Sequence, residues 1–548
     1  MSALGGATAL AGCGGQKTTG DGPGGAGTTG DGNTNTGGGA KGGTFINTTA
    51  EDATTLDPRM NELAWVNGMM HYLFDTLLAV KPDGSEIVPH LAKEKPKKQD
   101  EKTYTIPLKQ DVKFHNGNEM TAEDVAYSFS WVLNPDNKST NQENLSFVES
   151  VEASGDYEVT FNLKHPYALF ELTLAGMNSA IVPKKEAKSK GQKKFAQKPV
   201  GSGPFQLKEW KSGSHLTLER FGDYFLKSPN LKQVKYRVIP EAQTAYVELA
   251  TGNVHQSSVS KNLLGEAEKK NNLKIKRISQ FDYNGLIFNA LHEPFGNRKV
   301  RKAMHYLVDY DEMLSATKGK LGKRSYGFMP KEVNEAWDFP WQEWKKKYYP
   351  EKDHDKAKKL LEEAGYDDGF NVKMSTHTSG KFKNMAIILQ NEMDKVGIKA
   401  EVQEVTIGQW LEQLDSGEYD VTFYGWSGGQ DPDGFYYYLF RNLRNDDSLP
   451  ENYVGNASAG MLHEAYPDSQ KLKKADENIR KARKLQSRDE RRKLYIQAAE
   501  AFQSEYPHIP VYSEQSATAW SNKVQGYDPT AFAAQPLCNE WSNASLKN

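Results

Sequence analysis

Apolar and polar residues follow two different periods along this chain. Residues 159–163 alternate apolar and polar side chains, which is typical of a half-buried β-strand, and residues 43–47 also favour a strand. Residues 65–78 instead carry large apolar side chains three to four positions apart, which predicts a helix. Residues 353–364 show the same helical spacing and end at Gly365, a residue that commonly terminates helices. The sequence therefore predicts a mixed α/β or α+β fold.

Local start signals extend this pattern over the rest of the chain. Thr121 precedes two acidic residues at the start of an apolar-periodic segment, which predicts a helix running through Val132. Further strands are expected at 104–108, 112–114 and 421–424, and further helices at 471–485 and 490–505. No segment repeats at a fixed period, so a solenoid or propeller is not expected.

Length, charge and cysteine content narrow the classes of protein. The chain has 548 residues, more than one hydrophobic core usually serves, which indicates two or more lobes. No apolar run is long enough to span a bilayer. The formal net charge of −2 provides no overall positive field for nucleic acid. The only cysteines, Cys13 and Cys538, stand near opposite ends and exclude a disulfide framework.

Lysines concentrate in residues 184–198. Such a run favours either an anion-binding patch or a solvated surface, and the solvated surface is the commoner case.

The N-terminal residues indicate export. Small apolar residues run from Ala3 to Gly12 and lead into Cys13, in a pattern that resembles a lipoprotein signal with its lipobox. Residues 14–42 are rich in Gly, Thr and Asp and are expected to form a disordered tether. No Lys or Arg precedes the apolar stretch, so an Ala/Gly-rich start with an incidental cysteine is the alternative. We expect lipidation at Cys13 and an extracytoplasmic location, periplasmic or on the cell surface, anchored to the outer face of the cytoplasmic membrane.

Several segments of residues 43–530 together resemble the family 5 extracytoplasmic solute-binding proteins, the peptide, nickel and oligosaccharide receptors of ABC importers. The pair at 112–117 and 121–129 is the most recognisable passage. The number, order and spacing of the segments carry the resemblance, since none is specific alone. The other segments are 56–58, 73–78, 199–205, 288–289, 294–295, 300–303 and 357–366.

The resemblance implies an α/β, bilobed fold of the periplasmic-binding-protein type (type II, cluster C) with an extra inserted N-terminal subdomain. Gly201 and Gly203 suit a tight crossing of the chain, where side chains would clash. The expected division is a signal remnant at 1–13, a tether at 14–42, lobe I at 43–71, 196–285 and 508–548, an inserted subdomain at 72–195, and lobe II at 286–507.

The resemblance also implies a function. The protein is expected to capture a small peptide in the cleft between its lobes and deliver it to the permease and ATPase subunits of an ABC importer. An oligosaccharide receptor and a ligand-presenting sensory protein are the alternatives. We expect a monomer that is not an enzyme, since the sequence contains no metalloprotease, nucleophile-elbow, phosphate-loop or dinucleotide motif. No cofactor, metal or nucleic acid is expected.

The strongest candidate for ligand binding is the glycine-rich segment 424–435, which follows a predicted strand. In peptide-binding relatives this loop supplies a Trp and, three residues later, an Asp that pairs with the amino terminus of the peptide. Trp426 matches the first of these residues, but Gly429 stands at the second. Recognition of an amino group by this loop is therefore in doubt.

The polar residues that follow Gly429 are further candidates. Gln430, Asp431 and Asp433 lie close to the expected anchor position. The alternative for the two acids is an Asx turn on either side of Pro432.

Other candidates come from segments that contact ligand in relatives. Glu62 and Trp65 follow the 56–58 segment, with helix capping or core packing as the alternative. Asn289 ends a strand expected at the lobe boundary and could equally cap a turn. Trp410 matches a pocket-lining position, although a Trp at the start of an amphipathic helix is more often core.

Two observations bear on the identity of the ligand. His377 and Lys381 stand where some peptide receptors hold the carboxy terminus, and aromatic residues cluster at 435–438. Aromatic rings suit stacking on sugars as well as contact with peptides. Peptide remains the first expectation and oligosaccharide the second.

Overall fold

The structure, a computed structural model, describes the chain in two compact units. It covers residues 42–547 apart from 62, 379, 443–457 and 533–535. We call residues 42–278 with 516–547 the terminal unit, and residues 279–515 the middle unit. The predicted lipidation site Cys13 and the candidate Glu62 lie outside the described residues.

The observed division can be compared with the predicted lobes. The chain enters the middle unit at residue 279 and leaves it after residue 515. The predicted boundaries at 286 and 508 lie 7 and 8 residues from residues 279 and 516, respectively. Residues 72–195 belong to the terminal unit. The separate inserted subdomain therefore stays a prediction.

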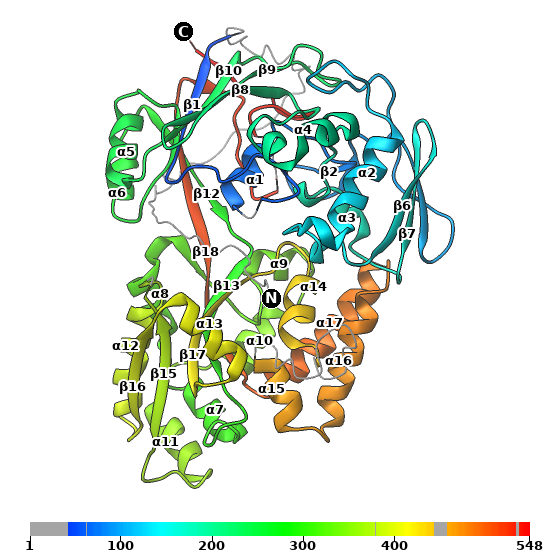
Figure 1. Ribbon diagram of the computed structural model, residues 1–548. Coiled ribbons are helices and arrows are strands. Elements are labelled where there is room, and N and C mark those ends of the chain that lie inside the picture. The colour runs from blue at the N-terminus through cyan, green and yellow to red at the C-terminus, as the bar shows by residue number, and fades with distance from the viewer. Residues whose placement is uncertain (1–41, 62, 379, 443–457, 533–535, 548) are drawn as a thin grey trace, which may run out of the picture. The chain divides into compact units, whose positions relative to one another are not determined.

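The terminal unit contains a mixed sheet in the order β8-β9-β10-β1-β11-β18, and its first strand β1 runs parallel to β10 and β11 (Figure 1). The other neighbours are antiparallel. The strands are β1 Thr44–Thr49, β8 Phe205–Lys211, β9 His215–Arg220, β10 Gln233–Val238, β11 Gln256–Ser258 and the second half of β18 His508–Ser521. Beside them are β12 Leu273–Ser279 and the short pair β19 Val524–Gln525 with β20 Ser545–Leu546.

A second, antiparallel sheet of the same unit has the order β4-β5-β7-β6. Its strands are β4 Lys97–Lys98, β5 Thr103–Pro107, β6 Val148–Gly155 and β7 Glu158–Leu163, and the hairpin β2 Leu78–Val80 with β3 Ile87–Pro89 stands apart. The helices of the terminal unit are α1 Ala64–Met70, α2 Ala122–Leu133, α3 Phe170–Leu174, α4 Lys184–Gln197, α5 Ala242–Ala250 and α6 Leu264–Ala267.

One continuous hydrophobic core joins both sheets of the terminal unit. It contains Phe45 and Val234 from the mixed sheet and Phe129 and Phe161 from the second sheet and its helix. Because these side chains belong to one buried cluster, the two sheets share the stabilisation that burial of apolar area provides.

Most sequence-predicted elements are confirmed in type. Helix α2 starts after Thr121, whose side chain and that of Asp124 form a capping box. Asp353 caps its predicted helix by accepting a hydrogen bond from the Lys356 amide at 3.0 Å. Two predictions are wrong. The helix expected over 65–78 ends at Met70, and residues 112–114 form only an isolated bridge rather than a strand.

The two glycines of the 199–205 segment lie where the chain passes Tyr72 and Leu73. A Cβ atom on Gly201 would lie 2.0 Å from the Leu73 carbonyl oxygen, and one on Gly203 would lie 2.6 Å from that of Tyr72. The prediction that these glycines permit a close crossing is confirmed.

We expect Gly201→Ala to lower the free energy of unfolding by about 2 kcal/mol, since the backbone must shift to admit the methyl group. Thermal unfolding measures the effect. Gly222→Ala is the matched control, because no atom lies within 4 Å of a Cβ at that position. Equal stability of the two variants would contradict the close crossing.

A buried polar cluster lies around Asp75 in the terminal unit. Its carboxylate accepts hydrogen bonds from Ser202 Oγ at 2.9 Å and Tyr224 OH at 3.1 Å, and it lies 2.8 Å from His90 Nε2. A Glu540 oxygen lies 3.7 Å from the other ring nitrogen of His90. Burial opposes protonation of His90, but the carboxylates of Asp75 and Glu540 outweigh it and raise the pKa of His90 to about 9.

The stability of the terminal unit is expected to fall as the pH rises through about 9. The pKa of His90 in the folded state exceeds the ordinary value of 6.5, so protonation favours folding. This contribution is complete below pH 6.5 and is lost as the pH passes 9. Thermal unfolding between about pH 7 and pH 10 measures it, and His90→Gln should flatten the dependence. An unchanged pH profile in His90→Gln would contradict this assignment.

The middle unit contains a sheet in the order β16-β15-β17-β13-β18, with β14 paired to β18. β15 runs parallel to β16 and β17, whereas β13 is antiparallel to β17 and β18. All seven residues of β13 are buried, which places it at the centre of the unit. The strands are β13 Asp282–Phe288, β14 Gly322–Arg324, β15 Asn371–His377, β16 Lys399–Val405, β17 Val421–Ser427 and the first half of β18.

Helices surround this sheet, and α16 and α17 lie side by side (Figure 1). Among the described residues, no helix combines the length and apolar character needed to cross a membrane. The helices of the middle unit are α7 Arg298–His305, α8 Tyr310–Thr317, α9 Lys331–Ala336, α10 Trp341–Tyr348, α11 His354–Glu362, α12 Lys383–Asp394, α13 Ile407–Ser416, α14 Asp433–Phe440, α15 Ser458–Ala465, α16 Gln470–Ala482 and α17 Arg488–Gln503.

Candidate functional site

Trp426 stands near the end of β17, at the entry to a tight glycine-containing loop. Its Nε1 donates a hydrogen bond to the carbonyl oxygen of Gly434 at 2.7 Å, which fixes the half-buried ring against the start of α14. A Cβ atom on Gly434 would lie 1.8 Å from the Gly428 carbonyl oxygen, so the loop closes on itself. Gly429 adopts a φ of +75°, a conformation that favours glycine. The loop therefore holds Trp426 in one orientation.

Five rings form a continuous aromatic row beside this strand. Neighbouring centroids are separated by 5.1, 6.0, 6.4 and 6.0 Å, within the range of favourable ring contacts. Trp410 Nε1 donates to Thr422 Oγ1 at 2.9 Å, which anchors the row to β17. Tyr438, at one end, is 37% exposed. In order, the row consists of His377, Trp410, Tyr424, Trp426 and Tyr438.

The two acids of this segment contact two side chains of α17 and Arg483, which directly follows α16. Asp431 accepts two hydrogen bonds from Arg491, at 2.6 and 2.9 Å, and a third from the amide of Asp433 at 2.9 Å. Asp433 is fully buried, accepts from Tyr495 OH at 2.9 Å and lies 3.2 Å from Arg483. Burial raises the pKa of Asp433, while the Arg483 guanidinium opposes the rise.

This geometry gives both acids a structural role. Asp431 forms the Asx turn that the sequence left open, and both acids attach the loop to the helices behind it. Their assignment as ligand contacts stays a prediction, which this geometry does not favour.

A second polar group lies on β13, β18, the loop after β15 and the end of α8. Sequence reasoning singled out only its Lys381. Glu514 pairs with Lys381 and Lys318, each at 2.8 Å. Asp282 accepts from the Glu514 amide and from Asn284 Nδ2, each at 2.8 Å. Burial, together with the nearby Glu514 carboxylate, raises the pKa of Asp282. We call these five residues the charged cluster.

The charged cluster and the aromatic row flank the same end of β17. Asn284 pairs with Gly425 in the sheet, and a Cβ on Gly425 would lie 2.5 Å from Asn284 Oδ1 and 3.4 Å from Lys381 Nζ. Because successive side chains of a strand alternate, the cluster lies on the face opposite Tyr424 and Trp426. The arrangement offers stacking surfaces on one face and paired charges on the other.

The remaining candidates lie elsewhere or have local partners. Asn289 is buried and donates to the carbonyl oxygens of Gly417 and Tyr419. It therefore caps a turn, which was the alternative to ligand binding in the sequence analysis. The backbone oxygen of Gln430 accepts from Trp337. Trp65 lies on α1 in the terminal unit and packs against the core there. None of these assignments to ligand binding is tested by the structure.

The described side chains include no group of three or more His, Cys, Asp or Glu residues arranged to hold a metal ion. The groups described above in the middle unit are aromatic ring faces, a rigid loop and fixed charges.

Comparison with known proteins gives a consistent result. A family model described as "Bacterial extracellular solute-binding proteins, family 5 Middle" matches residues 86–447. The oligopeptide-binding protein AppA from Bacillus subtilis is 30% identical over 446 residues, which cover 77% of this chain and 78% of that protein.

Solved structures agree with the predicted fold. HbpA2 from Haemophilus parasuis matches with a TM-score of 0.79 at 24% identity, over 92% of this chain and 100% of the other. DppA from Helicobacter pylori, solved in complex with the peptide STSA, matches with a TM-score of 0.73 at 24% identity, over 93% and 99%. These matches confirm the α/β fold of the periplasmic-binding type.

Proposed function

This chain belongs to family 5 of the bacterial extracellular solute-binding proteins, and we propose that it captures a small peptide for delivery to an ABC importer. The oligopeptide-binding relative supports the peptide as ligand. The partners in this proposal are the permease and ATPase subunits of the importer.

The observation that carries the proposal is the aromatic row at the end of β17. Rigid rings held by neighbouring hydrogen bonds provide large contact area at low entropic cost, which suits a ligand of variable side chains. Tyr438 is exposed, whereas His377, Trp410 and Trp426 are half-buried and Tyr424 is buried. In this proposal the row contacts the peptide, and Trp410 supports Trp426 through Tyr424.

The paired acids of the loop lead to a specific expectation about the peptide. A peptide amine would have to compete with Arg491 for Asp431 and with Arg483 for the buried Asp433. The proposal therefore assigns the amino terminus no carboxylate partner in this loop.

We expect acetylation of the amino terminus to change peptide affinity by less than about fivefold. Isothermal titration of ligand-free protein with a tripeptide and its N-acetyl form measures the ratio. A loss of about a hundredfold on acetylation would show that a carboxylate recognises the amine.

The same protein tests the ligand class. Peptides of two to five residues are expected to raise the melting temperature, because a ligand that binds only the folded state stabilises it. Oligosaccharides of similar size are expected to leave it unchanged. Stabilisation by oligosaccharides alone would contradict the peptide as ligand and would assign the aromatic row to stacking on sugar rings.

We further propose that the protein is a monomer outside the cell, attached to the membrane by lipid at Cys13. Support comes from the lipobox-like residues before Cys13 and the extracellular character of the family. Mass spectrometry of protein from the native membrane tests this, since diacylation adds a defined mass to the peptide containing Cys13. The cleft between the lobes and the inserted subdomain at 72–195 remain predictions.

A further inference from the structure

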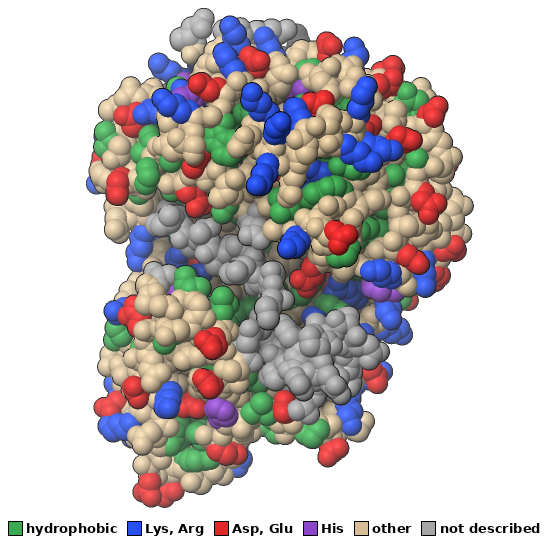
Figure 2. Space-filling model, in the orientation of Figure 1, with side chains coloured by type: hydrophobic (Ala, Val, Ile, Leu, Met, Phe, Trp, Pro, Cys, Tyr) green, Lys and Arg blue, Asp and Glu red, His purple; other side chains and the backbone are tan. Residues whose placement is uncertain are grey.

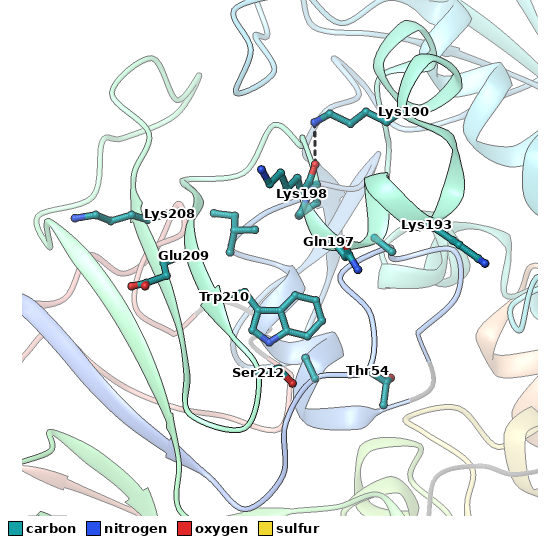
Figure 3. Close-up of a pocket in the computed structure, with 13 residues that line it drawn as sticks. Thr54, Lys190, Lys193, Gln197, Lys198, Lys208, Glu209, Trp210 and Ser212 are labelled. Atoms are coloured by element: carbon teal, nitrogen blue, oxygen red, sulfur yellow. Dashed lines mark hydrogen bonds between the residues drawn. The ribbon is translucent and has the colours of Figure 1, made fainter.

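A lysine-lined pocket lies in the terminal unit and includes part of the lysine-rich run 184–198. Its volume is about 920 Å³, within the range of small-molecule sites. Lys190, Lys193 and Lys198 come from α4 and its end, and Lys208 comes from β8. Figure 3 shows Lys190 and Lys198 above Trp210, and Lys208 and Lys193 on opposite sides of it with their side chains extending outward. We propose that this pocket binds a phosphate-bearing ligand, independently of the peptide site.

Two backbone irregularities set where these lysines lie around the pocket. Gly191 interrupts α4 with a φ of 67° and a ψ of 163°, so the helix changes direction between Lys190 and Lys193. In β8, Leu207 pairs with Leu218 and Glu209 with Thr217, which leaves Lys208 as the extra residue of a β-bulge. Bulges redirect side chains and are frequent beside functional sites. An uninterrupted helix and a regular strand would not present the same four lysines.

Charge in the pocket is unbalanced. Lys190 pairs with Glu186 at 2.9 Å and donates to the Lys198 carbonyl oxygen at 2.9 Å (Figure 3). Among the described residues, Lys193, Lys198 and Lys208 have no carboxylate within 4.0 Å.

One acidic residue lines the pocket, against four lysines, so the lining keeps a net positive charge. Glu209, the one acid of the lining, lies 3.2 Å from His215. Lysine and arginine side chains also gather on the surface around α4 (Figure 2). In a chain with a net charge of −2, this concentration of positive charge creates a local field that attracts anions.

The floor of the pocket is a fixed aromatic ring. Trp210 Nε1 donates to Asp52 Oδ1 at 3.1 Å, and the other oxygen of Asp52 accepts from Ser212 Oγ and the Gly213 amide, each at 2.7 Å. These bonds hold the half-buried indole in place. The ligand that fits is therefore a phosphate group, or several, joined to an apolar or ring-containing part.

Two sources supply that chemistry: soluble phosphorylated compounds and phospholipid headgroups. Both would place phosphate oxygens between ammonium groups of α4 and β8. They differ in whether the ligand is free in solution or part of a membrane surface, which an experiment separates.

The first test uses the full chain and inorganic tripolyphosphate in low-salt buffer. Isothermal titration is expected to show saturable binding that weakens with added salt. The combined variant Lys193→Ala, Lys198→Ala and Lys208→Ala is expected to bind at least about tenfold more weakly while keeping its peptide affinity. The matched control replaces Lys227, Lys269 and Lys274, exposed lysines of the same unit outside the pocket, and is expected to bind like the wild type.

The second test distinguishes the sources. Vesicles of phosphatidylglycerol are compared with vesicles of phosphatidylcholine in a flotation assay. Tripolyphosphate binding without flotation indicates a soluble ligand, and tripolyphosphate binding with flotation on phosphatidylglycerol indicates a headgroup, in each case only if the pocket variant loses the signal. Absence of tripolyphosphate binding, or an equal loss in the control variant, would overturn the proposal.

Discussion

Replacement of Trp426 by alanine is expected to weaken peptide binding about a hundredfold, equivalent to about 2.7 kcal/mol. Trp426 occupies the aromatic row between Tyr424 and Tyr438, at centroid separations of 6.4 and 6.0 Å. Removing the indole deletes a half-buried stacking surface from the row. It also removes the hydrogen bond to Gly434, so the loop loses part of its support.

Isothermal titration with a peptide ligand measures the loss, and thermal unfolding without ligand measures the accompanying change in stability. Trp341→Ala is the matched control, because Trp341 is another half-buried tryptophan of the middle unit and stacks on Tyr326 outside the row. Trp426→Phe keeps a ring but cannot donate to Gly434, and we expect intermediate affinity. If Trp426→Ala bound the peptide with wild-type affinity, the assignment of Trp426 as a ligand contact would be wrong.

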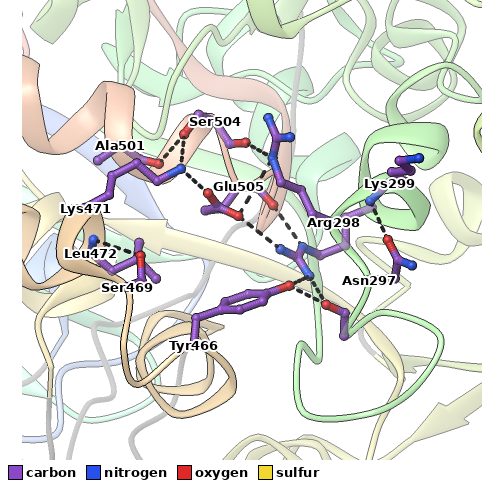
Figure 4. A network of polar contacts seen from close by, with 12 residues as sticks. Asn297, Arg298, Lys299, Tyr466, Ser469, Lys471, Leu472, Ala501, Ser504 and Glu505 are labelled. Atoms are coloured by element: carbon purple, nitrogen blue, oxygen red, sulfur yellow. Dashed lines mark hydrogen bonds and ion pairs between the residues drawn. The ribbon is translucent and has the colours of Figure 1, made fainter. Parts of the chain in front are cut away.

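The second large effect is expected at Arg301, where Arg301→Met should lower the free energy of unfolding of the middle unit by about 3–5 kcal/mol. Arg301 is fully buried on α7. It donates to the carbonyl oxygens of Glu505 at 2.9 Å and of Phe295 at 2.6 Å, and to Tyr466 OH at 3.0 Å. Figure 4 shows two of these partners, Glu505 and Tyr466. Methionine fills similar volume but leaves these buried acceptors without their donor.

Hydrogen exchange of the peptides around Phe295 and Glu505, together with thermal unfolding, measures this loss. Arg298→Met is the matched control on the same helix. Arg298 has a side chain 50% exposed and contacts the same turn, through Ser504 and Glu505. An exposed arginine of this kind should contribute less than about 1 kcal/mol. A similar small effect from both variants would show that the Arg301 network does not hold α7 to the end of α17.

The local elements that the sequence predicted correctly are those whose signals are local. Helix α11 follows its capping residue Asp353, and β7 follows the clean alternation of residues 159–163. The helix expected through residue 78 fails because Leu73 and Leu77 are buried in an irregular segment after α1, which begins with a turn. Apolar spacing reports burial, and a buried irregular segment can carry the same spacing as a helix.

The candidate site was predictable only in part. Trp410 and Trp426 could be singled out because each has a recognisable neighbourhood in the sequence. Whether Asp431 faces a ligand or a partner could not be decided, because Arg491 follows it by 60 residues. Of the charged cluster, only Lys381 was singled out, since Asp282 and Glu514 are separated by 232 residues and meet through pairing of β13 with β18.

The most direct test of the central claim is native mass spectrometry of the full chain, purified gently enough to retain any ligand acquired in the cell. The account predicts a series of bound masses that fragment into amino-acid residues, and it predicts that Trp426→Ala loses most of them. A single bound mass that fragments into sugar units would contradict peptide capture.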